Sequence, residues 1–73
     1  MTNNENLKNL AKQIKILRGK NSMTQEELAK ASGVSACAIT FIESCKKKPR
    51  VATLIKIAKA LNVDESELLN YIF

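Results

Sequence analysis

The sequence predicts a single small all-α domain made of five short helices: two observations predict the helices, and the chain length predicts the single domain. Apolar residues recur three and four positions apart along most of the 73-residue chain, as they do on one face of a helix. Residues that cap helix N-termini stand just before several of these segments. A chain of this length forms one small domain, residues 1–73, in which only about 60% of the unfolded chain's surface is buried on folding.

The first helix is expected from Leu7 to about Arg18. Its apolar stripe consists of Leu7, Leu10, Ile14 and Leu17. The opposite face is basic and is either a solvated surface or a surface that attracts phosphates; it carries Lys8, Lys12 and Lys15. Gly19 is the expected helix breaker, because glycine interrupts a helical pattern at low steric cost.

The stretch from Thr24 to Glu43, TQEELAKASGVSACAITFIE, predicts two short helices joined by a tight turn, which is a helix-turn-helix. Thr24 has the chemistry of an N-cap, and Glu27 stands three residues later to complete a capping box. The first of these helices should therefore begin at about Gln25. Gly33 follows where the helix end needs a left-handed residue without a Cβ.

Ser35 is the expected N-cap of the second helix of this motif. Ile39 and Ile42 are expected to face the core, because they lie three residues apart on one stripe. The outward face is the candidate functional surface, and it consists of Ala36, Cys37, Thr40, Phe41 and Ser44.

A charged loop and two more helices complete the predicted fold. The loop contains Lys46, Lys47, Lys48 and Arg50 around the single proline, Pro49. A fourth helix is expected from Val51 to Leu61, with Asn62 at its C-terminal end. The fifth is expected from about Glu65, because Asp64 and Glu67 repeat the capping-box spacing. Its apolar residues either complete the core or form a subunit interface; we expect Leu68 inside and, at the interface of a homodimer, Leu69, Ile72 and Phe73.

The charge is unevenly distributed and predicts an anionic partner. The chain carries a formal net charge of +5, and all 12 of its Lys and Arg residues lie at or before Lys59. The segment after Lys59 is acidic, because it contains Asp64, Glu65 and Glu67 and no base. A basic body of this kind attracts polyanions, chiefly nucleic acid or an anionic membrane surface.

The composition argues against several other classes. There is no His, and Cys37 and Cys45 lie about two turns apart on one predicted helix, beyond disulfide reach. No nucleophile and base pair or metal set can be assembled, so we expect no enzyme, no metal, no cofactor and no small-molecule substrate. The chain start does not resemble a signal peptide and no apolar run of about 18 residues occurs, so a cytoplasmic protein without membrane contact is expected.

Four segments in register resemble the Cro/C1-type helix-turn-helix family, also called the XRE or lambda-repressor-like family. They are MTQEELA at 23–29, GVS at 33–35, ITFIE at 39–43 and LIKIAKALNVDESELL at 54–69. The resemblance implies a compact five-helix lambda-repressor-like DNA-binding domain, with the helix-turn-helix at helices 2 and 3. It further implies a transcriptional regulator, a repressor or controller, that binds an inverted repeat in double-stranded DNA as a homodimer.

The resemblance also implies residue roles. Gln25 matches a residue that contacts a backbone phosphate, and residues 35–44 match the recognition helix, with Ser35 at its start and Ser44 at its end. The residues at its base-reading positions are Ala36, Cys37, Thr40 and Phe41. Arg18 and Glu43 match a structural salt bridge. The loop that matches a phosphate-gripping segment contributes Lys46, Lys47, Lys48 and Arg50.

The sequence departs from the family pattern in two respects. On the reading face many members carry side chains that form bidentate hydrogen bonds to G or A, whereas this chain has Ala36, Cys37, Ala38 and Phe41, so direct base readout is reduced. Cys45 stands where the family often has Gly after the recognition helix. The first departure keeps open an alternative function, a protein-interaction module such as the antitoxin of a toxin-antitoxin pair.

Overall fold

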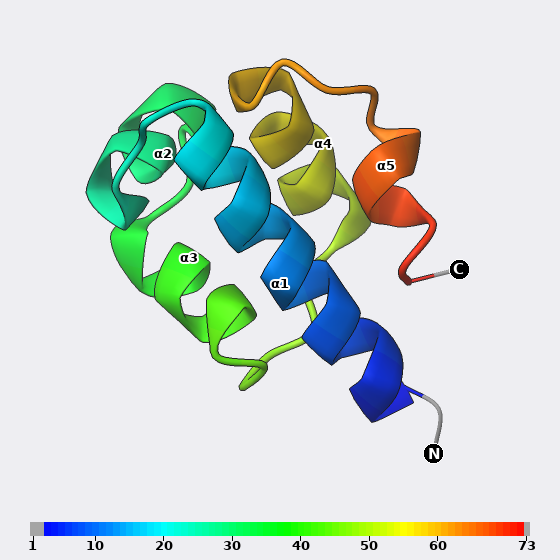
Figure 1. Ribbon diagram of the computed structural model, residues 1–73. Coiled ribbons are helices and arrows are strands. Elements are labelled where there is room, and N and C mark those ends of the chain that lie inside the picture. The colour runs from blue at the N-terminus through cyan, green and yellow to red at the C-terminus, as the bar shows by residue number, and fades with distance from the viewer. Residues whose placement is uncertain (1–2, 73) are drawn as a thin grey trace.

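The computed structural model describes residues 3–72 and, within that range, contains five helices and no strand. The predicted all-α class and the order of the helices are confirmed. The helices are α1 (Asn3–Lys20), α2 (Gln25–Ser32), α3 (Ala36–Glu43), α4 (Val51–Ala60) and α5 (Ser66–Leu69). In Figure 1 the long α1 crosses the view, with α2 and α3 on one side of it and α4 and α5 on the other.

One hydrophobic core holds all five elements together. Its largest fully buried side chains come from every helix and from the residue after α4: Leu10, Ile14, Leu28, Ile39, Leu54, Ile57, Leu61 and Leu68. Burying a side chain of this kind contributes roughly 1.5–3 kcal/mol. Because α2 packs on both α3 and α4, and α1 packs on both α3 and α5, the helix-turn-helix shares its core with the rest of the chain.

Four residues in the left-handed conformation turn the chain after the first four helices. Their φ angles are 55° at Ser22, 75° at Gly33, 62° at Cys45 and 60° at Asn62. After α1, the Met23 amide donates to the Arg18 carbonyl at 2.9 Å and the Ser22 amide donates to the Gly19 carbonyl at 3.1 Å. This pair of hydrogen bonds defines a Schellman motif, which satisfies carbonyls left free at a helix end.

The prediction that Gly19 ends the first helix is wrong. Gly19 lies inside α1, and the left-handed residue is Ser22. Asn21 supports the turn, because its Nδ2 donates to the Leu17 carbonyl at 2.9 Å and to the Leu61 carbonyl at 3.2 Å. Together with this tertiary contact to the end of α4, the left-handed residue lies at Ser22, three residues beyond the glycine.

The N-terminal caps differ between helices. Thr24 and Glu27 form the predicted capping box, with the Glu27 amide 3.0 Å from Thr24 Oγ1 and the Thr24 amide 2.8 Å from Glu27 Oε1. The capping box predicted for α5 is wrong. Asp64 Oδ2 instead accepts a hydrogen bond from the Ser66 hydroxyl at 3.1 Å, and the Glu67 amide donates to the Asp64 main-chain carbonyl at 2.9 Å. This tight turn shortens the helix, so α5 has only 4 residues.

The C-terminal helix completes the core. Leu68 is fully buried and Leu69 is only 9% exposed, because α5 packs against α4 and α1 of its own chain. Little of the Leu69 side chain is therefore left for the subunit interface that the sequence predicts there. Ile72 is half-buried against the same core, and Phe73 lies outside the described residues.

Candidate nucleic-acid interface

The turn between α2 and α3 is defined by the backbone conformation of Gly33 and by two main-chain hydrogen bonds. Gly33 adopts φ 75°, its amide donates to the Ala29 carbonyl at 2.9 Å, and the Val34 amide donates to the same carbonyl at 3.1 Å. A residue with a Cβ costs roughly 1–2 kcal/mol in the left-handed conformation, and glycine avoids this cost at the point where the chain changes direction. Ser35 then starts α3, because its hydroxyl accepts a hydrogen bond from the Ala38 amide at 3.1 Å.

The outer face of α3 has the composition that the sequence predicts. Ile39 and Ile42 are buried, whereas five side chains along the other face are exposed: Ala36, Cys37, Thr40, Phe41 and Ser44. Phe41 is 43% exposed, a large apolar side chain open to solvent. The face is therefore mostly apolar, with Thr40 in its middle and the hydroxyl of Ser44 3.3 Å from the Phe41 carbonyl.

The basic loop lies beside this face. Lys46, Lys47, Lys48 and Arg50 are all exposed, while Pro49 between them is buried and holds the loop against the body of the domain. An open hollow of about 380 Å³ separates the loop from α3. Its lining includes Cys37 and Phe41 from α3 and Lys47, Lys48 and Arg50 from the loop. The structure thus brings the outward face of α3 and the cationic loop onto one side of the molecule.

Thr53, from the first turn of α4, also lines this hollow. The periodicity of the sequence gives no reason to select it, because it lies between positions of the apolar stripe of α4. Only the return of the chain from the loop into α4 brings its hydroxyl-bearing side chain near α3.

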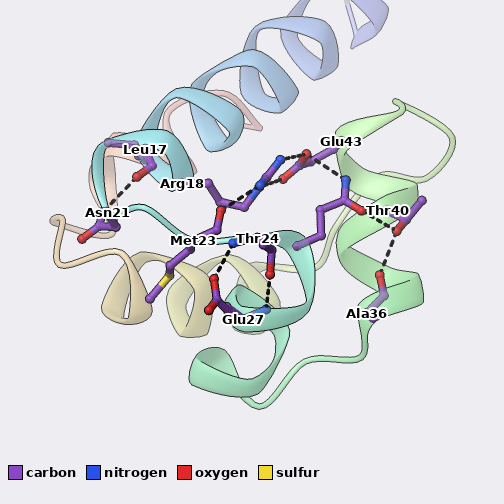
Figure 2. Close-up of polar contacts among 10 residues, drawn as sticks. Leu17, Arg18, Asn21, Met23, Thr24, Glu27, Ala36, Thr40 and Glu43 are labelled. Atoms are coloured by element: carbon purple, nitrogen blue, oxygen red, sulfur yellow. Dashed lines mark hydrogen bonds and ion pairs between the residues drawn. The ribbon is translucent and has the colours of Figure 1, made fainter.

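Arg18 and Glu43 fix the position of α3 relative to α1. Arg18 Nε lies 2.6 Å from Glu43 Oε2 and Arg18 Nη2 lies 2.9 Å from Glu43 Oε1, so the pair is bidentate (Figure 2). The Glu43 side chain is 2% exposed and the Arg18 side chain 19% exposed. The hydrogen bonds that Arg18 donates to Glu43 raise the pKa of the guanidinium above its ordinary value; partial burial opposes this rise, and the nearby negative charge of Glu43 adds to it.

Gln25 extends this ion pair to the outer face of α3. Its Nε2 donates to Glu43 Oε1 at 3.0 Å, and its Oε1 accepts a hydrogen bond from the Thr40 hydroxyl at 3.0 Å. Thr40 Oγ1 also lies 3.0 Å from the Ala36 carbonyl (Figure 2). The resulting chain of contacts runs from Arg18 in α1 through Glu43 and Gln25 to Thr40.

The contact between Gln25 and Thr40 has no signal in the sequence. The two residues lie 15 positions apart and on different helices, so no helical spacing relates them. The family resemblance assigns Gln25 to a phosphate contact. In the structure one of its side-chain N–H groups is already used within the protein, and the amide has a second N–H group.

No helix among residues 3–72 is both long enough and apolar enough to cross a lipid bilayer.

Comparison with known proteins agrees with this geometry. The HTH_3 family profile, described as Helix-turn-helix, matches residues 14–68. An uncharacterized HTH-type transcriptional regulator from Archaeoglobus fulgidus is 43% identical, with 75% of this chain and 89% of that protein covered. Control protein C.SmaI from Serratia marcescens is 37% identical, with 82% of this chain and 71% of that protein covered.

A solved structure has the same fold. The crystal structure of an HTH_3 family transcriptional regulator from Vibrio cholerae matches 94% of this chain with a TM-score of 0.85 and 30% sequence identity. The chain spans only 39% of the length of that protein. The match over most of the chain, together with the profile match from Ile14 to Leu68, shows that the chain belongs to the HTH_3, Cro/C1-type helix-turn-helix family of DNA-binding transcriptional regulators.

Proposed function

We propose that this protein represses or controls transcription by binding a short inverted repeat in double-stranded DNA as a homodimer. The observation that carries the proposal is the position of the α3 face beside Lys47, Lys48 and Arg50 across one open hollow. A recognition helix in the major groove and cations on the flanking phosphates require this arrangement. The name of the related control protein C.SmaI supports a controlling role.

The chemistry of the side chains indicates which residues contact the bases and which contact the phosphates. Thr40, Ala36, Cys37 and Phe41 face the bases, Phe41 and Ala36 through apolar contact with thymine methyl groups. Lys46, Lys47, Lys48 and Arg50 neutralise phosphates, and Ser35 and Ser44 approach the backbone from the two ends of α3. The second side-chain N–H of Gln25 donates to a phosphate near the N-terminus of α2, where free main-chain amides also favour an anion. Specificity then depends partly on the shape of the DNA.

Dimerisation is proposed through the C-terminal end of the chain. Ile72 is half-buried and Leu69 contributes only its 9% exposed surface, so Ile72 and Phe73 supply most of the proposed contact. A two-fold dimer places its recognition helices about 34 Å apart, in successive major grooves of a palindromic site.

Selection of bound sequences from a random DNA pool at physiological salt tests this function. We expect enrichment of an inverted repeat whose half-sites lie about one helical turn apart. Sedimentation analysis of the protein on the enriched duplex should give two chains per site. Folded protein that enriches no sequence would overturn the proposal.

One observation favours a second candidate. The 43% exposure of Phe41 on a face that lacks bidentate hydrogen-bonding side chains also suits a protein-interaction module, such as an antitoxin that binds its toxin. The selection separates the two functions, because a module that binds only protein enriches no DNA sequence.

A further inference from the structure

We propose that Thr40 reads DNA only as a hydrogen-bond acceptor, and therefore selects a base that offers an exocyclic amino group at its position in the major groove. The inference rests on the proposed DNA-binding function and deepens it. The Thr40 hydroxyl can in principle donate one hydrogen bond and accept others. The groups around it decide which of these abilities remains for the DNA.

The amide of Gln25 has a fixed orientation. Its Nε2 lies 3.0 Å from Glu43 Oε1, and Glu43 is the ion-pair partner of Arg18 at 2.6 Å. An ionised carboxylate only accepts hydrogen bonds, so the amide must turn its nitrogen toward Glu43. The flipped amide would hold two oxygens against one another. Gln25 Oε1 therefore points to Thr40.

Among residues 3–72, Thr40 Oγ1 consequently faces two acceptors and no donor. Gln25 Oε1 and the Ala36 carbonyl oxygen each lie 3.0 Å from it. The hydroxyl has a single proton, and that proton is shared between these two oxygens or given to one of them. If the hydroxyl proton turned toward the DNA, Gln25 Oε1 and the Ala36 carbonyl oxygen would each lie 3.0 Å from Oγ1 without a hydrogen bond, which is unfavourable.

The outward side of Thr40 therefore presents oxygen lone pairs. Donors in the major groove are the N6 amino group of adenine and the N4 amino group of cytosine, whereas N7 and O6 of guanine and O4 of thymine are acceptors. Thr40 should favour the amino groups and disfavour acceptors at the same place. The Arg18, Glu43 and Gln25 contacts thus determine the polarity of the base-reading group.

The test begins with two selections from one random DNA pool, using the wild-type protein and Thr40→Val, which replaces the hydroxyl with a methyl group of similar size. We expect the operator position that Thr40 reads to show adenine or cytosine on the strand it faces. Thr40→Val should lose that preference and keep the rest of the site. Phe41→Leu is a comparison variant on the same face that leaves the hydroxyl in place: it should change the selected site only at the bases that Phe41 contacts and keep the adenine or cytosine preference at the Thr40 position.

Base analogues in the selected duplex then test the polarity directly. Removing the amino group, with purine in place of adenine or 2-pyrimidinone in place of cytosine, should weaken wild-type binding by roughly 3- to 10-fold. It should leave Thr40→Val binding unchanged. Removing the N7 acceptor of the purine with a 7-deaza analogue should affect the two proteins equally.

A loss that is specific to the wild-type protein with the 7-deaza analogue, or with an analogue that lacks guanine O6 or thymine O4, would overturn the inference, because Thr40 would then donate. Equal responses of both proteins to every analogue would also overturn it. If the wild-type selection enriches no sequence, the proposed function itself fails, and that result differs from failure of the polarity alone.

A measurement on the free protein checks the contact that carries the argument. The Gln25 side-chain amide resonances in a ¹⁵N correlation spectrum should shift in Thr40→Val and remain in place in Phe41→Leu. Unchanged Gln25 resonances in Thr40→Val would show that the two side chains do not meet, and would remove the basis of the inference.

Discussion

Arg18 and Glu43 join α1 to α3 through two parallel hydrogen bonds of 2.6 and 2.9 Å between residues 25 positions apart. Arg18 Nη1 also donates to the Met23 carbonyl at 2.9 Å, so the same side chain fixes the connection into α2. The guanidinium thus contacts both α3 and the connection between α1 and α2.

Arg18→Met should strongly destabilise the fold. It leaves the buried Glu43 carboxylate without its cation, which typically costs about 3–5 kcal/mol. Urea unfolding should therefore show a free energy of unfolding lower by about 3 kcal/mol. Replacing both residues with Met should recover much of this loss, because no unpaired charge remains. Lys20→Met, on an exposed position of the same helix, should change stability by no more than about 0.5 kcal/mol. An equal effect of Arg18→Met and Lys20→Met would contradict the structural role of the ion pair.

The two glycines should respond to alanine with opposite signs. No atom lies within 4 Å of a Cβ built at either position, so only the backbone conformation distinguishes them. Gly33→Ala places a Cβ at φ 75° and should lower the free energy of unfolding by about 1–2 kcal/mol. Gly19→Ala lies in α1 and should raise it by about 0.5–1 kcal/mol. Thermal unfolding of the two variants under identical conditions measures both changes. Two shifts of the same sign would contradict the assigned helix ends.

Replacing each of the two cysteines with glycine should change the stability in opposite directions. Cys45 stands at φ 62°, where glycine avoids the cost of a left-handed side chain, so Cys45→Gly should raise the free energy of unfolding by about 0.5–1 kcal/mol. The expected rise is a net value, because Cys45→Gly also removes the weak hydrogen bond from the Cys45 thiol to the Leu7 carbonyl at 3.6 Å. Cys37→Gly, in the first turn of α3, should lower it by a similar amount. Urea titrations in the presence of a reductant compare the two. A destabilised Cys45→Gly variant would mean that the thiol contact outweighs the backbone term.

The basic loop should determine the salt dependence of DNA binding. Each phosphate contact adds about 0.9 to the slope of log K against log salt concentration on duplex DNA. Lys47→Gln and Lys48→Gln should each reduce that slope by about 0.9 and weaken binding to all sequences alike. Fluorescence anisotropy on the selected duplex between 50 and 200 mM salt measures it. The control is Lys59→Gln, which removes the same charge from the last turn of α4. If Lys59→Gln changes the slope as much as Lys47→Gln, net charge rather than the loop sets the affinity.

Local sequence chemistry predicts most of the helices. Thr24 with Glu27 and Ser35 mark the starts of α2 and α3 correctly, because a cap needs only side chains and amides within three residues of one another. Gly33 and Asn62 mark helix ends for a similar local reason, since both residue types tolerate the left-handed conformation.

The local rules fail where a distant contact competes with them. Gly19 remains helical because Asn21 binds the Leu61 carbonyl at the end of α4 and moves the turn to Ser22. Asp64 has the spacing of a cap, yet it binds the Ser66 hydroxyl in a tight turn and leaves α5 with a single turn of helix. Val51 belongs to the apolar stripe of α4 but is 39% exposed, because it stands at the helix start, away from the core.

By itself, the sequence determined the helical class, the helix-turn-helix, and which side chains of α3 face outward, because these depend on periodicity and on contacts within a few residues. Tertiary structure decided that the loop containing Lys47 and Lys48 lies beside Phe41, and that Gln25 reaches both Glu43 and Thr40. Such contacts depend on how α2 and α3 cross and on where the chain returns into α4. Packing of the shared core fixes these relations, and hydrogen-bond polarity at Thr40 follows only after the helices have been placed.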